Sequence, residues 1–263
     1  MIATGADRAH ALARKHGPGR PGWARRLHQA FGYTSPDAWY EGTVLRIVRQ
    51  GDAVLDAGGG AAISPHNRAA SALIAERCAH LVALDQSDNV LRHALAHERV
   101  QATLQAYAPN RTFDVICLRM VAEHVADPPG AVAALARLVR PGGYVIIYTV
   151  SRFAVLSMLG AVLPHTVHIV AMRLLFGGAA RDTHPAYYRM NTRAKLDRLF
   201  TGAGFAAAGF QRLDDCRTTQ RWRGPHVAEL CVWRVLSWLG VPYPEACLLA
   251  VYRREPPANI RGA

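Results

Sequence analysis

The sequence predicts an α/β fold: an open, mostly parallel sheet with helices on both faces, one antiparallel late strand and helical cap insertions. Short apolar segments alternate with helical segments between residues 53 and 150, which is typical of parallel strands that are buried on both faces. The chain has 263 residues, of which 51% are hydrophobic and 19% charged. This length suits one domain with insertions, or at most two small domains. The composition excludes a disordered or fibrous chain.

Residues 1–34 form a basic segment ahead of this pattern. Glycine and proline interrupt it between residues 17 and 22, and it has no apolar stretch of the kind found in secretory signals. We expect a mobile or loosely docked arm with one helical turn near Trp23–Phe31. A single domain is expected over residues 35–263, beginning with a helix that Ser35 and Pro36 initiate and that ends near Arg49.

The later elements follow from apolar runs and turn residues. Strands are expected at 53–57, 81–84, 99–104, 113–118, 144–150, 207–213 and 247–253. Helices are expected at 65–78, 87–97, 129–139 and 191–203. Ser64 is the expected cap of the first of these helices, and Asn191 with Thr192 caps the last.

Two apolar insertions, at about 151–190 and 216–246, break the alternation. Polar residues and a proline interrupt the first, so we do not expect it to span a membrane. We expect both insertions to be amphipathic helices that cover the ligand crevice at the carboxyl ends of the strands. Trp233 and Trp238 in the second are expected in the core or in a dimer contact.

The segment from Val54 to Gly60 reads VLDAGGG, an apolar strand that runs through Asp56 into a glycine turn. Ile63 stands where a dinucleotide fingerprint needs a small residue, and a P-loop lysine is absent. A second carboxylate, Asp85, ends the next strand, where it can accept hydrogen bonds from a ribose diol. Two carboxylates beside a glycine turn favour a nucleoside that carries positive charge.

Taken together, these segments resemble the class I S-adenosylmethionine-dependent methyltransferases. The segments that carry the resemblance are 54–60, 81–85, 113–128 and 140–143. Residues 184–205 also resemble the later part of bacterial small-molecule and lipid methyltransferases. The resemblance implies a Rossmann-like fold, S-adenosylmethionine as cofactor, and methyl transfer to a small acceptor.

The resemblance also implies which residues hold the cofactor. At the third strand, family members often carry an acidic residue near adenine; residues 102–105 offer none, so Thr103, Gln105 or backbone groups are expected to recognise the base. Ala62 stands where the family usually continues the glycine turn. The residues expected at the methionine part are Asp56, Gly58 and Gly60, and Asp85 is expected at the ribose hydroxyls.

Candidate catalytic residues follow the fourth strand. His124 is placed to act as a general base near neutral pH, with Glu123 beside it. A structural hydrogen-bonding role explains the same histidine better than the general-base role does. Arg119 is expected either to touch a carboxylate of substrate or cofactor, or to pair with a nearby acid.

Tyr40, Tyr188 and Arg189 are candidate walls of the acceptor pocket, although each is also explained by ordinary packing. The apolar insertions favour an apolar or amphiphilic acceptor, with O-, N- or C-methylation left open. A homodimer and a peripheral membrane contact are compatible with the same insertions.

The formal charge of +12 raises a nucleic-acid partner as an alternative. The cations are nearly all arginine and are spread along the chain, which favours a basic surface over a selected phosphate-binding site. An RNA methyltransferase and a non-catalytic methyltransferase-like subunit remain the alternatives. Five cysteines without a CxxC pair indicate a reducing cytoplasm, and no metal site is expected.

Overall fold

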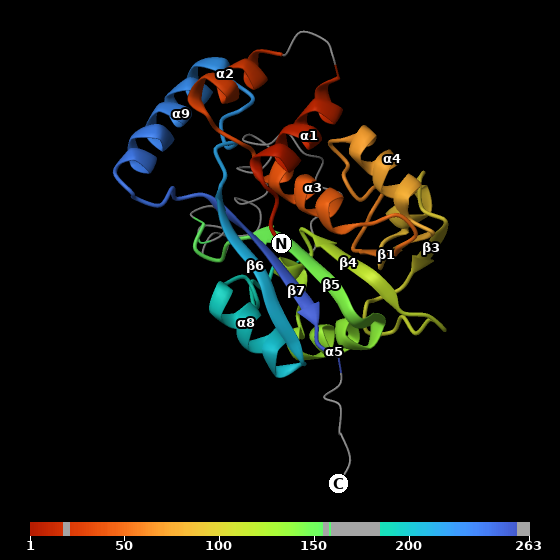
Figure 1. Cartoon of the computed structure of the whole chain (residues 1–263). Coiled ribbons are helices and arrows are strands. Elements are labelled where there is room, and N and C mark those ends of the chain that lie inside the picture. The colour runs from red at the N-terminus through yellow and green to blue at the C-terminus, as the bar shows by residue number, and fades with distance from the viewer. Residues whose placement is uncertain (18–21, 155–157, 159–184, 257–263) are drawn as a thin grey trace.

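The computed structural model describes residues 1–17, 22–154, 158 and 185–256. These residues form one seven-stranded sheet flanked by helices, with the strand order β3-β2-β1-β4-β5-β7-β6 (Figure 1). The pairs among β1 to β5 are parallel, and β7 runs antiparallel to both β5 and β6. This architecture confirms the predicted fold class. The strands are β1 (Ala53–Ala57), β2 (His80–Asp85), β3 (Glu98–Gln101), β4 (Phe113–Arg119), β5 (Val139–Val150), β6 (Phe205–Asp214) and β7 (Ala246–Arg254).

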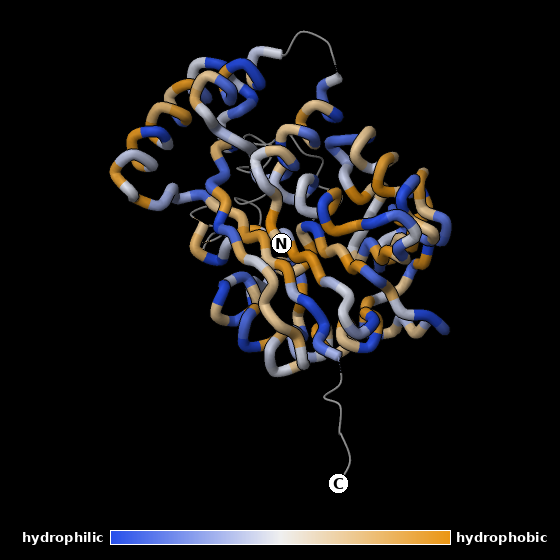
Figure 2. Tube along the Cα trace, in the orientation of Figure 1, coloured by the Kyte–Doolittle hydropathy of each residue, from blue (hydrophilic) through white to orange (hydrophobic). Residues whose placement is uncertain are grey.

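Alternate residues of the central strands face two separate hydrophobic cores. Val54 and Val115 pack in the core under α1, α3 and α4, whereas Leu55 and Ile116 pack in the core with α5 and α8. Hydrophobic residues accordingly concentrate along the central strands (Figure 2). The helices are α1 (Gly5–His16), α2 (Trp23–Phe31), α3 (Pro36–Ile47), α4 (Arg68–Arg77), α5 (Pro128–Leu138), α8 (Arg193–Gly202) and α9 (Arg223–Trp238), with 3-10 turns η1 (Asp88–Arg92) and η2 (Ala122–His124).

Local hydrogen bonds shift several predicted boundaries. Asn67, not Ser64, caps α4, because its side chain accepts the N–H of Ala70 at 3.1 Å. The helix expected at 87–97 is only the short η1, since the His93 ring accepts the N–H of Ala96 and removes it from a helical ladder. Strand β5 begins at Val139, earlier than expected, because Val139 already pairs with Phe113.

The N-terminal residues differ most from the sequence-based expectation of a loosely docked arm. Helix α1 packs on α3, where a Cβ on Gly42 would lie 3.1 Å from Asp7 backbone. The N–H of Ala3 donates to Thr43 Oγ1 at 3.0 Å, and Asn67 Nδ2 donates to the carbonyl of Ala11 at 3.1 Å. Helix α1 is held against the domain by these polar contacts and by the close approach that Gly42 permits.

The insertion at 216–246 contains α9, which lies beside α2 (Figure 1). A small hydrophobic cluster joins the two helices, and Arg234 Nη1 donates to the carbonyl of Phe31 at 3.2 Å. Trp233 packs in this cluster, whereas Trp238 is 84% exposed. Most of the other insertion, including the apolar stretch within 155–184, lies outside the described residues. No helix within the described ranges is both long and apolar enough to cross a membrane.

Candidate functional site

A cavity of about 320 Å³ opens at the carboxyl ends of β1, β2 and β4. We call it the nucleoside cavity. Its walls come from the turn after β1, the end of β2, the loop after β3 and the segment after β4. Ligands of open α/β sheets bind at this edge, because the loops that connect the strands to their helices converge there.

The glycine turn after β1 needs its glycines for two reasons. Gly58 and Gly60 have φ values of +71° and +48°, in the left-handed region that side chains disfavour. A Cβ on Gly58 would lie 2.2 Å from Cγ2 of Val121, whereas nothing lies within 4 Å of a Cβ built on Gly60. The backbone at Gly60 is therefore open to close approach by a ligand.

Asp56 lies beneath this turn rather than in the cavity. Its side chain is 1% exposed and does not line the nucleoside cavity. Because His93 Nδ1 accepts the N–H of Ala96, a neutral His93 carries its proton on Nε2, which lies 3.6 Å from Asp56 Oδ2. Burial raises the pKa of Asp56. Asp56 thus faces His93 and does not line the cavity near which the sequence predicts its cofactor contact.

Asp85 does line the nucleoside cavity. Its Oδ2 accepts the N–H of Gly60 at 3.1 Å, and its Oδ1 accepts the N–H and the hydroxyl of Ser87 at 2.8 and 2.9 Å. A carboxylate offers about four lone-pair sites. The protein fills most of them, so the carboxylate is held in one orientation and its remaining acceptor capacity lies on Oδ2.

The loop after β3 forms another wall, with the exposed residues Thr103 and Gln105. Thr103 Oγ1 accepts the N–H of Ala106 at 3.3 Å, and the carbonyl of Gln105 accepts from Arg137 Nη2 at 3.3 Å. Sequence reasoning found no acid on this loop, but Asp127, the N-cap of α5, lines the same cavity. The Asp-Pro-Pro sequence of that cap was the signal for a fixed carboxylate there.

His124 lines the nucleoside cavity and is held by the segment that precedes α8. Its Nδ1 lies 3.0 Å from the carbonyl oxygen of Pro185. Because a carbonyl can only accept, Nδ1 carries the proton and the lone pair of the neutral ring is on Nε2. The N–H groups of Tyr187 and Tyr188 donate to the carbonyl of Glu123, which fixes η2 from the same side.

The side chain of Glu123 is buried and points away from the cavity. It accepts the hydroxyl of Thr149 at 2.6 Å, and Asn191 Nδ2 donates to the same hydroxyl at 2.7 Å. Burial raises the pKa of Glu123. This network ties η2 to β5 and to the start of α8, so Glu123 positions the turn that carries His124.

Arg119 pairs with an acid, which is the second of the two roles expected for it. Its Nη2 donates to Asp37 Oδ1 at 3.3 Å, and Arg217 binds Oδ2 of the same carboxylate. Arg217 also binds Asp215 through its Nε at 2.6 Å. Burial favours the neutral form of Asp37, but Arg217 and Arg119 lower its pKa to about 2. Asp37 is therefore a carboxylate at neutral pH.

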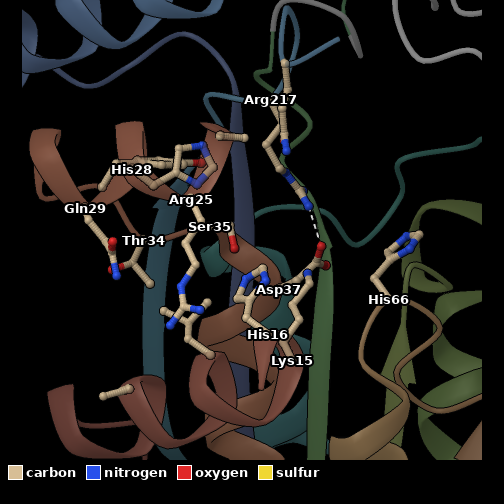
Figure 3. A pocket seen from close by; sticks show the side chains of 15 residues that line it. Lys15, His16, Arg25, His28, Gln29, Thr34, Ser35, Asp37, His66 and Arg217 are labelled. Atoms are coloured by element: carbon tan, nitrogen blue, oxygen red, sulfur yellow. Dashed lines mark hydrogen bonds and ion pairs between the residues drawn. The ribbon is translucent and has the colours of Figure 1, made fainter. Parts of the chain in front are cut away.

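A second cavity of about 590 Å³ lies between α1, α2, the start of α3 and the segment after β6. We call it the N-terminal cavity. Figure 3 shows Arg217 reaching to Asp37 at its centre, with Lys15, Arg25 and His66 among the surrounding side chains. The expectation of a loosely docked arm over the first residues does not include this cavity, because its walls need α1 and α2 docked on the domain.

Residues 20–208 match a family model described as a methyltransferase domain. The chain belongs to this methyltransferase family. The match confirms the resemblance to S-adenosylmethionine-dependent methyltransferases that the motifs carry. It also covers the segments that build the nucleoside cavity.

The names of two curated relatives of this methyltransferase assign those proteins to ubiquinone biosynthesis. It is 34% identical over 126 residues to the ubiquinone biosynthesis O-methyltransferase of Leptothrix cholodnii, which covers 43% of this chain and 50% of that protein. It is 35% identical over 131 residues to the enzyme of the same name from Thiobacillus denitrificans, covering 46% and 53%. The chain thus spans about half the length of these curated relatives.

Solved methyltransferase structures share the fold. The N-methyltransferase NodS from Bradyrhizobium japonicum WM9, in complex with S-adenosyl-L-homocysteine, aligns with a TM-score of 0.51 at 15% identity, covering 95% of this chain and 100% of that one. Magnesium protoporphyrin IX methyltransferase from Synechocystis PCC 6803 aligns with a TM-score of 0.51 at 15% identity, covering 95% and 94%. At this identity the likeness concerns the fold alone.

The residues predicted as acceptor walls lie elsewhere in this methyltransferase. Tyr40 is fully buried and stacks on Tyr148, with ring centroids 5.4 Å apart. Arg189 donates to the carbonyl of Ala126, and Tyr188 has a positive φ of 49°. None of Tyr40, Tyr188 and Arg189 lines either cavity. The ring of Tyr40 packs in the core, and the guanidinium of Arg189 binds a main-chain carbonyl just before α5.

Proposed function

We propose that this chain transfers a methyl group from S-adenosylmethionine to a small acceptor. One observation carries the proposal: in a chain of the methyltransferase family, the glycine turn lines this cavity through Gly58, and the N–H of Gly60 fixes the carboxylate of Asp85 in the same cavity. The open backbone accommodates a close ligand, and the carboxylate accepts hydroxyl hydrogens. The ribose hydroxyls of the cofactor require such an acceptor, and its nucleoside part requires such a space.

The residues around the nucleoside cavity fit the cofactor in distinct ways. When bound, S-adenosylmethionine supplies a methyl group that its sulfonium already activates. Asp85 accepts a ribose hydroxyl on Oδ2, and Gly60 admits the ligand close to the backbone. Thr103, Gln105 and Asp127 offer hydrogen-bonding groups on the remaining wall for adenine.

The chain has two further tasks, namely to place the acceptor and to receive its proton. Methyl transfer needs the acceptor atom held in line in a pocket that excludes water. His124 lines the nucleoside cavity, and it is the residue that we propose to receive the proton of a hydroxyl acceptor. The named O-methyltransferase relatives support a hydroxyl on a ring-containing, amphiphilic acceptor as the first class to test.

The cellular setting belongs to the same proposal. All five cysteines are free, and most of them are buried, which favours the reducing cytoplasm. Exposed apolar residues of α9, among them Val232, Val235 and Trp238, favour contact with a second copy or with a lipid surface over nucleic acid. An RNA acceptor predicts RNA binding that weakens steeply with salt.

Titration calorimetry with S-adenosylmethionine and S-adenosylhomocysteine tests the proposal. We expect both to bind, and Asp85→Ala to weaken both by about tenfold or more. If neither ligand binds the folded wild-type chain, the proposal is wrong. Mass spectrometry of extracts incubated with isotopically labelled donor then identifies the acceptor. Cofactor binding without any labelled product would favour the non-catalytic subunit.

A further inference from the structure

The N-terminal cavity carries a marked excess of positive charge. Its cationic lining residues are Lys15, Arg25 and Arg217, whereas Asp37 is its one acidic lining residue among those that the structure describes. These residues come from α1, α2, the segment after β6 and α3. Segments distant in the sequence therefore bring like charges to one cavity, which costs free energy unless an anion balances them.

Asp37 and Arg217, the acid and one of the cations in this cavity, form an ion pair with each other. Asp37 is 4% exposed and binds Arg119 through Oδ1 and Arg217 through Oδ2. Arg217 also holds Asp215 through Nε and Nη2, at 2.6 and 2.7 Å. These groups form a closed network of two cations and two carboxylates. Each oxygen of Asp37 thus contacts an arginine other than Arg25, and neither oxygen is within ion-pair distance of Lys15.

Lys15 and Arg25 are the cations that remain. Within the described ranges, neither side chain has a carboxylate within ion-pair distance or a protein acceptor within hydrogen-bond distance. Both are half-buried, Lys15 in the last turn of α1 and Arg25 near the start of α2. Two half-buried cations that line one cavity can share one anion, since a guanidinium binds two oxygens at once and an ammonium adds a third contact.

Three histidines around the same space respond to this positive field. Burial and the cations Arg25 and Lys15 lower the pKa of His16. Burial, His226 and the cations Arg217 and Lys15 lower the pKa of His28 to about 4. Burial also lowers the pKa of His66, with Asp37 acting in the opposite direction. His28 is therefore uncharged at neutral pH, and the positive field opposes protonation of His16 and His66.

We infer that the N-terminal cavity binds the acidic group, a carboxylate or a phosphate, of the acceptor molecule through Lys15 and Arg25. The inference rests on the proposed methyl transfer and names the class of its substrate. The volume of about 590 Å³ is within the range of pockets that enclose ring-containing ligands. Leu12, Ala24 and Tyr33 supply apolar wall for the rest of such a molecule. The acceptor is then an amphiphile, an acidic group attached to an apolar body.

Binding of matched probes to the wild-type chain tests the inference without turnover. The probes are 2-naphthoate, naphthyl phosphate and the uncharged 2-naphthamide, titrated with and without S-adenosylhomocysteine. We expect the acids to bind about tenfold more tightly than the amide, because the amide lacks the charge that both cations pair with. The better of the two acids distinguishes a carboxylate site from a phosphate site. Equal affinity for acid and amide, or no detectable binding of either acid, overturns the inference.

Variants locate the site. Lys15→Gln and Arg25→Gln should each weaken binding of the acids by about tenfold and leave the amide unchanged. Arg14→Gln, which removes the same charge from an exposed position of α1 outside the cavity, should have no effect. Acid binding that survives in the Lys15→Gln/Arg25→Gln double variant with a wild-type melting temperature contradicts the assignment.

The cofactor has a carboxylate of its own, so its affinity is measured in the same variants. We expect Lys15→Gln and Arg25→Gln to leave S-adenosylhomocysteine binding unchanged, since these residues line the other cavity. Loss of S-adenosylhomocysteine binding there would mean that the cations serve the cofactor, which overturns the inference while the proposed function stands. Failure of the wild-type chain to bind S-adenosylhomocysteine defeats the proposed function instead.

Discussion

The backbone N–H of Gly60 donates to Oδ2 of Asp85 at 3.1 Å. This bond joins the glycine turn after β1 to the end of β2, the two segments that form the floor of the nucleoside cavity. It fixes the carboxylate before any ligand arrives, so little ordering is needed on binding. The turn and the carboxylate thus act as one unit.

Replacing Asp85 should damage ligand binding more than folding. We expect Asp85→Asn to weaken S-adenosylhomocysteine by about tenfold, because the amide is neutral and presents one acceptor oxygen instead of two. Calorimetry measures the affinity, and thermal unfolding monitors the fold. Asp88→Asn, an exposed carboxylate three residues further on, is the control and should bind normally. Equal losses in both variants would show that Asp85 has no specific role.

Alanine substitutions at Gly58 and Gly60 should distinguish the role of the glycine turn in packing from its role in admitting a ligand. Gly58→Ala should destabilise the protein by about 2 to 4 kcal/mol, since a positive φ and the contact with Val121 add together. Gly60→Ala should cost about 1 kcal/mol and reduce cofactor binding, because its Cβ enters open space. Urea unfolding gives the free energy of unfolding, and calorimetry gives the affinity.

Gly51 supplies the control for that pair. It has a φ of +88° in the turn before β1, with nothing within 4 Å of a built Cβ. Gly51→Ala therefore reports the cost of the backbone conformation away from the cavity. If Gly60→Ala binds the cofactor as well as Gly51→Ala does, the ligand does not approach Gly60.

Asp37 should contribute stability that depends on pH in the acid range. Burial opposes its charge, but Arg217 and Arg119 hold its pKa at about 2, below the ordinary value of 3.8. A lowered folded-state pKa gives stability that is present above pH 3.8 and is lost as the pH falls toward 2. Asp37→Asn should lower the free energy of unfolding by roughly 2 kcal/mol at pH 7.

The pH dependence of that difference is the diagnostic measurement. Denaturant unfolding of wild type and Asp37→Asn should give free energies of unfolding that converge as the pH falls from 4 toward 2. Asp88→Asn should show no such convergence, because the side chain is exposed. A constant difference across this range would rule out a charge-dependent role for Asp37.

The contact between His28 and His226 should make stability fall at mildly acidic pH. The two Nε2 atoms lie 3.0 Å apart, and Glu229 binds Nδ1 of His226 at 3.3 Å. Burial, His226 and nearby cations lower the pKa of His28 to about 4, so the unfolded chain binds more protons between pH 6.5 and 4. Stability is therefore complete above pH 6.5 and declines as the pH drops to 4.

His28→Gln should flatten this decline, because glutamine keeps a donor for His226 but does not titrate. Denaturant unfolding between pH 4 and 7 measures the effect. His10→Gln, on the exposed face of α1, is the matched histidine control and should follow the wild-type curve. A wild-type curve that does not decline over this range would contradict the proposed contact.

The sequence alone determined the order of strands and helices, because the period of apolar residues is a local property that survives in the fold. The strands at 53–57 and 113–118 were predicted within one residue at each end. The glycine turn and Asp85 were also found, since a strand that ends in an acid beside glycines is a local pattern. Thr103 and Gln105 were implied by the resemblance to the methyltransferase family, and both line the nucleoside cavity.

Which of these side chains line a cavity depends on the three-dimensional packing. Asp56 turns toward His93, a residue 37 positions away by number, and the sequence does not reveal such a pairing. Lys15 and Arg25 line a cavity because α1 docks through Gly42 and Asn67. The docking of α1 depends on contacts between segments that are distant in the sequence, and on the free energy of removing them from water. Composition and the periodicity of apolar residues describe only neighbours along the chain.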